Sequence, residues 1–152
     1  MSQENLELVK RLQPSGLDLV EVFSVGADWF GSRDESELFT DDFEVAFISS
    51  ATTGQRLQAR GRDGFTAMWR EWLTTWRSYR LEAEKLIDAG DAVVVFARVE
   101  AQTERDGVLI QHSPAAIWRI REGRVAAVHH YLEREEALEA AGLSEQSARA
   151  DS

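Results

Sequence analysis

The sequence of 152 residues contains no cysteine and only two prolines, two methionines and three histidines. The lack of cysteine excludes disulfides, thiolate metal sites and a cysteine nucleophile. No apolar run reaches the roughly 20 residues that a membrane-spanning helix needs. The first ten residues, MSQENLELVK, are polar and acidic, unlike a signal peptide. We therefore expect a cytoplasmic protein with no membrane partner.

Basic residues are scarce relative to acidic ones. The sequence has 17 lysines and arginines but 27 aspartates and glutamates, which gives a formal net charge of −10. A surface of this charge repels phosphate backbones, so nucleic acid is not an expected partner. Phosphate-binding glycine loops, nucleophile elbows and His-Glu-x-x-His metal motifs are also missing from the sequence, and we expect no cofactor.

The composition is that of one folded domain. Hydrophobic residues make up 43% and charged residues 29% of the chain, as in globular proteins. A chain of this length can bury one substantial core. We expect a single domain over residues 1–143, followed by a flexible tail over residues 144–152, because the last nine residues are small and polar.

The spacing of apolar residues predicts helices before and among a series of strands. The clearest helix is expected over residues 63–77, where the large apolar side chains fall on one stripe. Helices followed by hairpin-linked strands are typical of the α+β class, here a curved antiparallel sheet with helices packed on one face. The expected helices are 2–13, 17–23, 63–77 and 134–143, the strands are 43–49, 55–61, 79–88, 92–105, 108–120 and 125–132, and the stripe is Phe65, Met68, Trp69, Trp72 and Trp76.

The last expected strand, RVAAVHHYLE, contains two adjacent histidines, whose side chains must point to opposite faces. Alternation places His130 with Val128 and Leu132, and His129 with Val125, Ala127 and Tyr131. Neither face is plainly polar, which indicates a central strand that is covered on both sides. Helices can cover the concave face and a second copy of the chain the convex one. We therefore predict a homodimer through Val125, Ala127, Tyr131 and the strand 92–105.

Four stretches carry a likeness to a known family: MSQENLELVK, LFTDDFEV, MWREWLTTWRSYRLEAEKLIDAGDAVVV and IWRIREGRVAAVHHYLEREEALEAAGL. In this order they resemble the nuclear transport factor 2-like superfamily, and within it the bacterial SnoaL-like proteins. The resemblance implies a cone in which helices line a strongly bent sheet around an internal pocket. Members include ketosteroid isomerases, polyketide cyclases, dehydratases and proteins without catalysis, so the fold alone assigns no function.

The catalytic residues of the family are only partly represented here. The resemblance places Phe47 where a ketosteroid isomerase has its aspartate base, Ala116 near the position of its oxyanion-hole acid, and Val9 near that of its tyrosine. In the SnoaL-like cyclases an acid/base aspartate lies inside the cone on the last strand. His130 falls at about that position, which implies a proton-transfer group of a different type.

His130 is therefore the candidate catalytic residue. A histidine that faces an apolar cone could act as general acid or base near neutral pH. The alternative is a packed histidine that is hydrogen-bonded to a neighbouring group. His112 lies on the same face as Trp118 when the alternation is counted through Ala116. A metal site is not expected, because two histidines need a third ligand that no spacing nominates.

The aromatic residues of the expected helix and strands predict a pocket wall, although core packing alone explains their spacing equally well. An apolar lining with few polar groups suits a small apolar ligand, such as a ring-containing or acyl molecule. The expected ligand-binding residues are Phe47, Trp69, Trp72, His112 and Trp118.

Two functions stay open. One is a cofactor-independent isomerase, cyclase or lyase in which His130 moves a proton. The other is a non-catalytic dimeric module that binds an apolar ligand or only fills its cone. An open cavity at His130 favours the first function, and a cone closed by tryptophan packing favours the second.

Overall fold

The computed structural model describes residues 2–13, 18–24, 38–48 and 56–142, so the expected tail over residues 144–152 lies outside the described residues. Helices and strands follow one another in the order expected for the α+β class. The helices are α1 (Ser2–Arg11), α2 (Leu19–Ser24), α3 (Gly61–Leu73) and α4 (Arg134–Ala140), and the strands are β1 (Phe39–Ile48), β2 (Arg56–Arg60), β3 (Trp76–Asp88), β4 (Ala92–Thr103), β5 (Leu109–His112), β6 (Ala115–Arg121) and β7 (Arg124–Tyr131).

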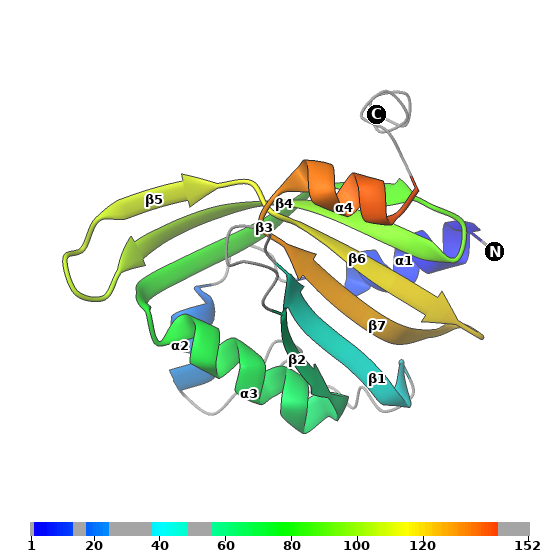
Figure 1. Ribbon diagram of the computed structural model, residues 1–152, viewed down its shortest axis with the longest axis horizontal. Helices are drawn as coiled ribbons and strands as arrows, with labels where there is room; N and C mark the ends of the chain where they lie inside the picture. The colour runs from blue at the N-terminus through cyan, green and yellow to red at the C-terminus, as the bar shows by residue number, and fades with distance from the viewer. Residues whose placement is uncertain (1, 14–17, 25–37, 49–55, 143–152) are drawn as a thin grey trace.

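The strands form one curved sheet in the order β2-β1-β7-β6-β4-β3, and β5 pairs with β4 (Figure 1). Neighbouring strands are antiparallel except β1 and β7, which run parallel. The first and last strands along the chain therefore lie side by side inside the sheet. This arrangement confirms the predicted α+β class with its curved sheet and adds one parallel pair.

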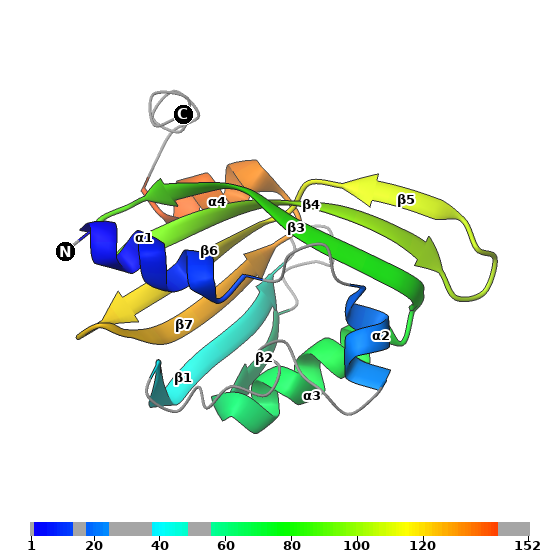
Figure 2. The same cartoon turned by 180° about the vertical axis from the view of Figure 1, so that it is seen from behind.

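Helices cover both faces of the sheet (Figures 1 and 2). Buried side chains of α1, α2 and α3, such as Val9, Leu19 and Trp69, share one core with the concave face. Ala137 and Leu138 of α4 pack instead on a separate cluster on the convex face. The N-terminal helices lie where the sequence predicts them, whereas α4 departs from the expectation that all helices share one face.

Helix α3 is shorter than the helix predicted over residues 63–77. Phe65, Met68, Trp69 and Leu73 are buried along one stripe, as expected. The helix ends at Leu73, where the Thr74 hydroxyl donates a hydrogen bond of 2.7 Å to the carbonyl oxygen of Glu71. Trp76 is the first residue of β3 and pairs with Thr103 of β4. Its place on the helical stripe was therefore predicted wrongly, because strand pairing overrides the helical spacing.

The strand predicted over residues 108–120 is divided at Pro114. Proline has no backbone N–H to donate to a neighbouring strand, and its carbonyl accepts a bond of 3.0 Å from the backbone N–H of Ala97. β5 ends at His112, which pairs with Val99, and β6 begins at Ala115, which pairs with Phe96. The alternation of side chains between the two faces of the sheet continues across the break at Pro114. His112 thus lies on the same face as Trp118, as predicted.

The convex face differs from the prediction at Val125. Between Arg119 and Ile120 the register of β6 and β7 shifts, which is typical of a β-bulge. Val125 consequently points into the concave core, where it is fully buried. Its assignment to the convex face was wrong, while Ala127 keeps the predicted face.

Arg134 fixes α4 to the convex face. Its Nη2 atom donates to Glu84 Oε2 at 2.8 Å and to the carbonyl oxygen of Ala97 at 2.9 Å. Its guanidinium carbon lies 4.4 Å from the centre of the Phe96 ring. The helix ends before Gly142, whose positive φ of 76° is typical of a residue that follows a helix. Part of the sheet face predicted to bind a second chain is thus covered by α4.

Candidate active site on the concave face

The two adjacent histidines of β7 lie on opposite faces of the sheet. His130 pairs with Phe47 of β1 and Ala116 of β6, and all three point to the concave side. His129 points to the convex side, where its Nε2 atom lies 3.8 Å from Glu44 Oε2. The structure therefore has His130 on the concave side and His129 on the convex side, as predicted.

Aromatic rings enclose the imidazole of His130. The Phe47 ring stacks on it at a centroid distance of 4.8 Å and an angle of 23°. Trp69 of α3 meets it edge to face at 5.2 Å and 87°. The Nε2 atom of His130 is buried from solvent. The structure thus brings the predicted catalytic residue together with two of the predicted ligand-binding residues.

Burial changes the acid–base chemistry of His130. Burial first, and then the neighbouring His129, lower the pKa of His130 from 6.5 to about 3. The imidazole is therefore neutral at physiological pH and takes up a proton less readily than an ordinary histidine. It can still exchange hydrogen bonds with a bound molecule through its ring nitrogens.

Trp72 and Tyr79 extend the aromatic wall away from His130. Trp72 stacks on Phe47 at 5.6 Å, and Tyr79 lies edge to face with Trp69 at 6.1 Å. Burial raises the pKa of Tyr79 to about 12, an effect that the Trp72 indole partly offsets. Tyr79 is thus a neutral phenol at physiological pH.

Tyr79 was not predicted as a site residue, and its position depends on a distant part of the chain. Asp18 Oδ1 accepts hydrogen bonds from the backbone N–H of Val20 at 3.1 Å and from that of Tyr79 at 2.9 Å. The first of these bonds is typical of a helix N-cap, here at the start of α2. The second joins this cap to β3. No local pattern around Tyr79 reveals that link.

His112 lies at the far end of the same wall. It meets Tyr79 at a ring distance of 6.3 Å. Burial lowers its pKa, and Glu133 counteracts that change. Among the described residues no ring contact joins His112 to His130, because Tyr79 and Trp69 form the connection between them.

Trp118 borders a small cavity beside His130. The cavity has a volume of about 30 Å³, and Leu81, Val95, Ala116 and His130 are among its lining residues. Trp118 itself is only 1% exposed, because it also belongs to the concave core. A cavity of this size accommodates about one water molecule.

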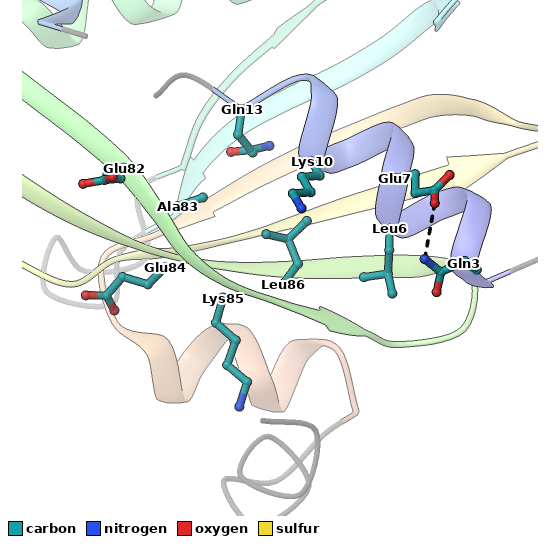
Figure 3. Close-up of a pocket in the computed structure, with 10 residues that line it drawn as sticks. All are labelled: Gln3, Leu6, Glu7, Lys10, Gln13, Glu82, Ala83, Glu84, Lys85 and Leu86. Carbon is teal, nitrogen blue, oxygen red and sulfur yellow. Dashed lines mark hydrogen bonds between the residues drawn. The ribbon is translucent and has the colours of Figure 1, made fainter. Parts of the chain in front are cut away.

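A second and larger hollow lies between α1 and the edge strand β3 (Figure 3). Its volume is about 630 Å³, within the range of about 300–1,000 Å³ that small-molecule sites occupy. Leu6 and Lys10 of α1 face Ala83 and Leu86 of β3 across it. None of the predicted site residues lines this groove.

Within the described ranges, no group of three or more His, Asp or Glu side chains could hold a metal ion. In the same part of the chain, no helix has the length and apolar character needed to cross a membrane.

Solved structures with the same fold support an assignment of the protein class. A putative SnoaL-like polyketide cyclase from Jannaschia sp. CCS1 has a TM-score of 0.63 at 19% identity, covering 91% of this chain and 92% of its own. TerC, co-crystallized with polyporic acid, has a TM-score of 0.60 at 18% identity, covering 91% and 98%. A phenazine biosynthesis-related protein from Pseudomonas aeruginosa has a TM-score of 0.60 at 15% identity, covering 93% and 87%. No curated protein matches the chain.

The curved sheet and its concave helices have the nuclear transport factor 2-like fold, which also occurs in a solved protein from Burkholderia pseudomallei. The family can be assigned as well, because the family model of the SnoaL-like domain matches residues 33–128. The chain belongs to the SnoaL-like family.

Proposed function

We propose that this SnoaL-like protein binds a small, mainly apolar, ring-containing molecule on the concave side of its sheet, next to His130. The observation that carries the proposal is that aromatic rings surround the imidazole of His130, which also lines a small cavity. Phe47 and Trp69 offer surfaces on which a flat molecule can stack. His130 offers the hydrogen-bonding group that fixes its orientation.

The comparisons support a ligand of this kind. TerC, whose fold is similar, was co-crystallized with polyporic acid, and the Jannaschia relative is described as a putative polyketide cyclase. Both descriptions concern small organic molecules. The net charge of −10 favours a neutral ligand over an anionic one.

Cofactor-independent isomerase, cyclase or lyase chemistry is the second candidate function. It is favoured by the position of His130, whose side chain borders the cavity and could move a proton of a bound carbon acid. Two observations favour binding without catalysis. The pKa of about 3 makes His130 a weak base, and the positions to which the resemblance assigns the isomerase catalytic groups are occupied by Phe47, Ala116 and Val9, none of which is an acid.

A thermal-shift titration with 1-naphthol tests the binding proposal. We expect the melting temperature of the wild-type protein to rise with 1-naphthol concentration, because a ligand that binds only the folded state stabilises it. His130→Ala should lose this rise, and His129→Ala should keep it. A rise of equal size in both variants would contradict a site at His130. Proton exchange at an acidic C–H of a ring ketone, lost in His130→Ala alone, would establish the catalytic candidate.

The homodimer stays a proposal with an altered interface. Val125 no longer belongs to it, and Tyr131 packs in the cluster under α4. Ala127 and His129 lie on the convex face outside that cluster and are the residues that a second chain would contact. The cytoplasmic location stays a prediction.

A further inference from the structure

The groove between α1 and β3 and the cavity at His130 share one residue. Gln13, which follows α1, lines both hollows. Its Nε2 atom donates a hydrogen bond of 3.1 Å to the carbonyl oxygen of Val9, and the side chain is half-buried. Figure 3 shows Gln13 at one end of the groove, beyond Lys10.

The floors of the two hollows are continuous on the concave face of the sheet. Leu86, which lines the groove, pairs with Val95, which lines the cavity. Ala83 of the groove pairs in the same way with Ala97 of the cavity. Paired residues of neighbouring strands lie on the same face about 5 Å apart. No strand or helix therefore needs to be crossed between the groove and the cavity.

The two volumes show why a connection matters. The cavity of about 30 Å³ holds no more than a water molecule, whereas a ring-containing ligand needs a site roughly ten times larger. The groove of about 630 Å³ is large enough but does not include His130. If the two hollows join, a ring that occupies the groove has room to contact the imidazole.

We propose that the α1–β3 groove is the outer part of the ligand site, and that Gln13 is the gate between this groove and His130. When its side chain leaves Val9, the apolar end of a ring-containing molecule enters along Ala83 and Ala97. A polar substituent stays in the groove beside Lys10. The ligand part of this inference rests on the proposed function, whereas the gate can be tested without any ligand.

The absence of cysteine makes a clean test of the gate possible, because one introduced thiol is a unique reporter. Ala116→Cys places this thiol in the cavity, beside His130. The rate of its reaction with N-phenylmaleimide is measured in three backgrounds: native Gln13, Gln13→Ala and Gln13→Trp. We expect Gln13→Ala to raise the rate by about tenfold, the equivalent of one broken hydrogen bond, and Gln13→Trp to lower it by a similar factor.

Ala92→Cys is the matched control, because Ala92 is also buried, at 2% exposed, but belongs to the convex cluster and lines neither hollow. The rate of the control thiol should be the same in all three backgrounds. If the rates of the cavity thiol and the control thiol change in parallel, the Gln13 variants act through unfolding and the gate is wrong. An unchanged rate in the Ala116→Cys protein, or no reaction there even with Gln13→Ala, would also overturn it. Should Ala116→Cys fail to fold, Ala97→Cys reports on the same cavity.

The outcome separates this inference from the proposed function. Gating of the cavity thiol together with a negative 1-naphthol titration would count against the ligand and leave the gate in place. A positive titration with an ungated cavity thiol would overturn the gate, because the ligand would then reach His130 by another path.

Discussion

The two faces of the sheet are filled by different kinds of side chain, and the adjacent histidines of β7 show the difference most directly. On the concave face, Phe47 and Trp69 surround His130 with aromatic rings. On the convex face, His129 lies near the carboxylate of Glu44. One peptide bond thus separates an imidazole in an apolar setting from one beside an acidic group.

The convex face is organised by charge as well as by apolar packing. Arg134 joins α4 to Glu84, and Arg98 lies within 4.0 Å of the carboxylates of Glu82 and Glu84. Polar contacts of this kind hold α4 in place. The concave face combines rings with cavities, which is the combination that a ligand site requires.

The largest effect is expected from truncation of the concave wall. Trp69→Ala should lower the free energy of unfolding by about 3–5 kcal/mol, because Trp69 is fully buried and contacts Phe47, Tyr79 and His130. Trp72→Ala, at a half-buried position, should cost roughly 1–3 kcal/mol. Urea unfolding followed by circular dichroism measures both values. Equal losses of unfolding free energy in the two variants would show that Trp69 does not stabilise the aromatic wall more than Trp72 does.

The next effect concerns the anchor of α4 on the convex face. Arg134→Ala should cost about 1–3 kcal/mol, because it removes an ion pair, a bond to the Ala97 carbonyl and the contact with Phe96. Arg98→Ala is the matched control and should cost no more than about 1 kcal/mol, since its ion pairs are exposed. The same urea experiment applies. A larger loss for Arg98→Ala would contradict the anchoring role.

The third effect is the pH dependence of stability, which should differ between the two histidines. The folded pKa of His130, about 3, lies below its ordinary value of 6.5, so the unfolded chain binds the proton first as the pH falls. His130 therefore stabilises the fold above pH 6.5 and loses this contribution progressively towards pH 3. His112, whose pKa burial also lowers, acts in the same direction.

Between about pH 6.5 and pH 5, the free energy of unfolding should fall by roughly 1.5 kcal/mol because of His130. Urea unfolding at both pH values should show this loss in the wild type and in His129→Gln. His130→Gln should show a smaller pH dependence. If His130→Gln retains the wild-type dependence, His130 does not have a depressed pKa.

The last effect concerns assembly and is expected at the proposed dimer interface. Ala127→Glu should convert a dimer to a monomer, because the carboxylates of two chains would meet at the convex face. Ala67→Glu, on the exposed side of α3, should leave the dimer intact. Sedimentation velocity at micromolar concentration distinguishes the outcomes. A wild-type monomer under these conditions would end the dimer proposal.

Much of the concave face could be predicted because the relevant patterns are local. The strict alternation of a strand separates His130 from His129, and helical spacing places Phe65, Met68 and Trp69 on one buried stripe. Each inference depends only on residues within a few positions of one another.

The errors occur where a distant segment decides the structure. Val125 changes face because of a register shift opposite Arg119 and Ile120, and Trp76 leaves the helix because it pairs with Thr103. Tyr79 joins the site through Asp18, which is distant in sequence. For Gln13 a local signal existed, since a glutamine four residues after Val9 can bond back to its carbonyl.

The central claim is that His130, and not His129, belongs to a ligand site. Nitrogen-15 NMR of the histidine side chains, assigned with the His112→Gln and His129→Gln variants, tests it directly. With 1-naphthol present, the ring nitrogens of His130 should shift while those of His129 do not, and His130 should stay neutral down to about pH 4. A ligand response at His129 alone, or titration of His130 near its ordinary pKa of 6.5, would contradict the account.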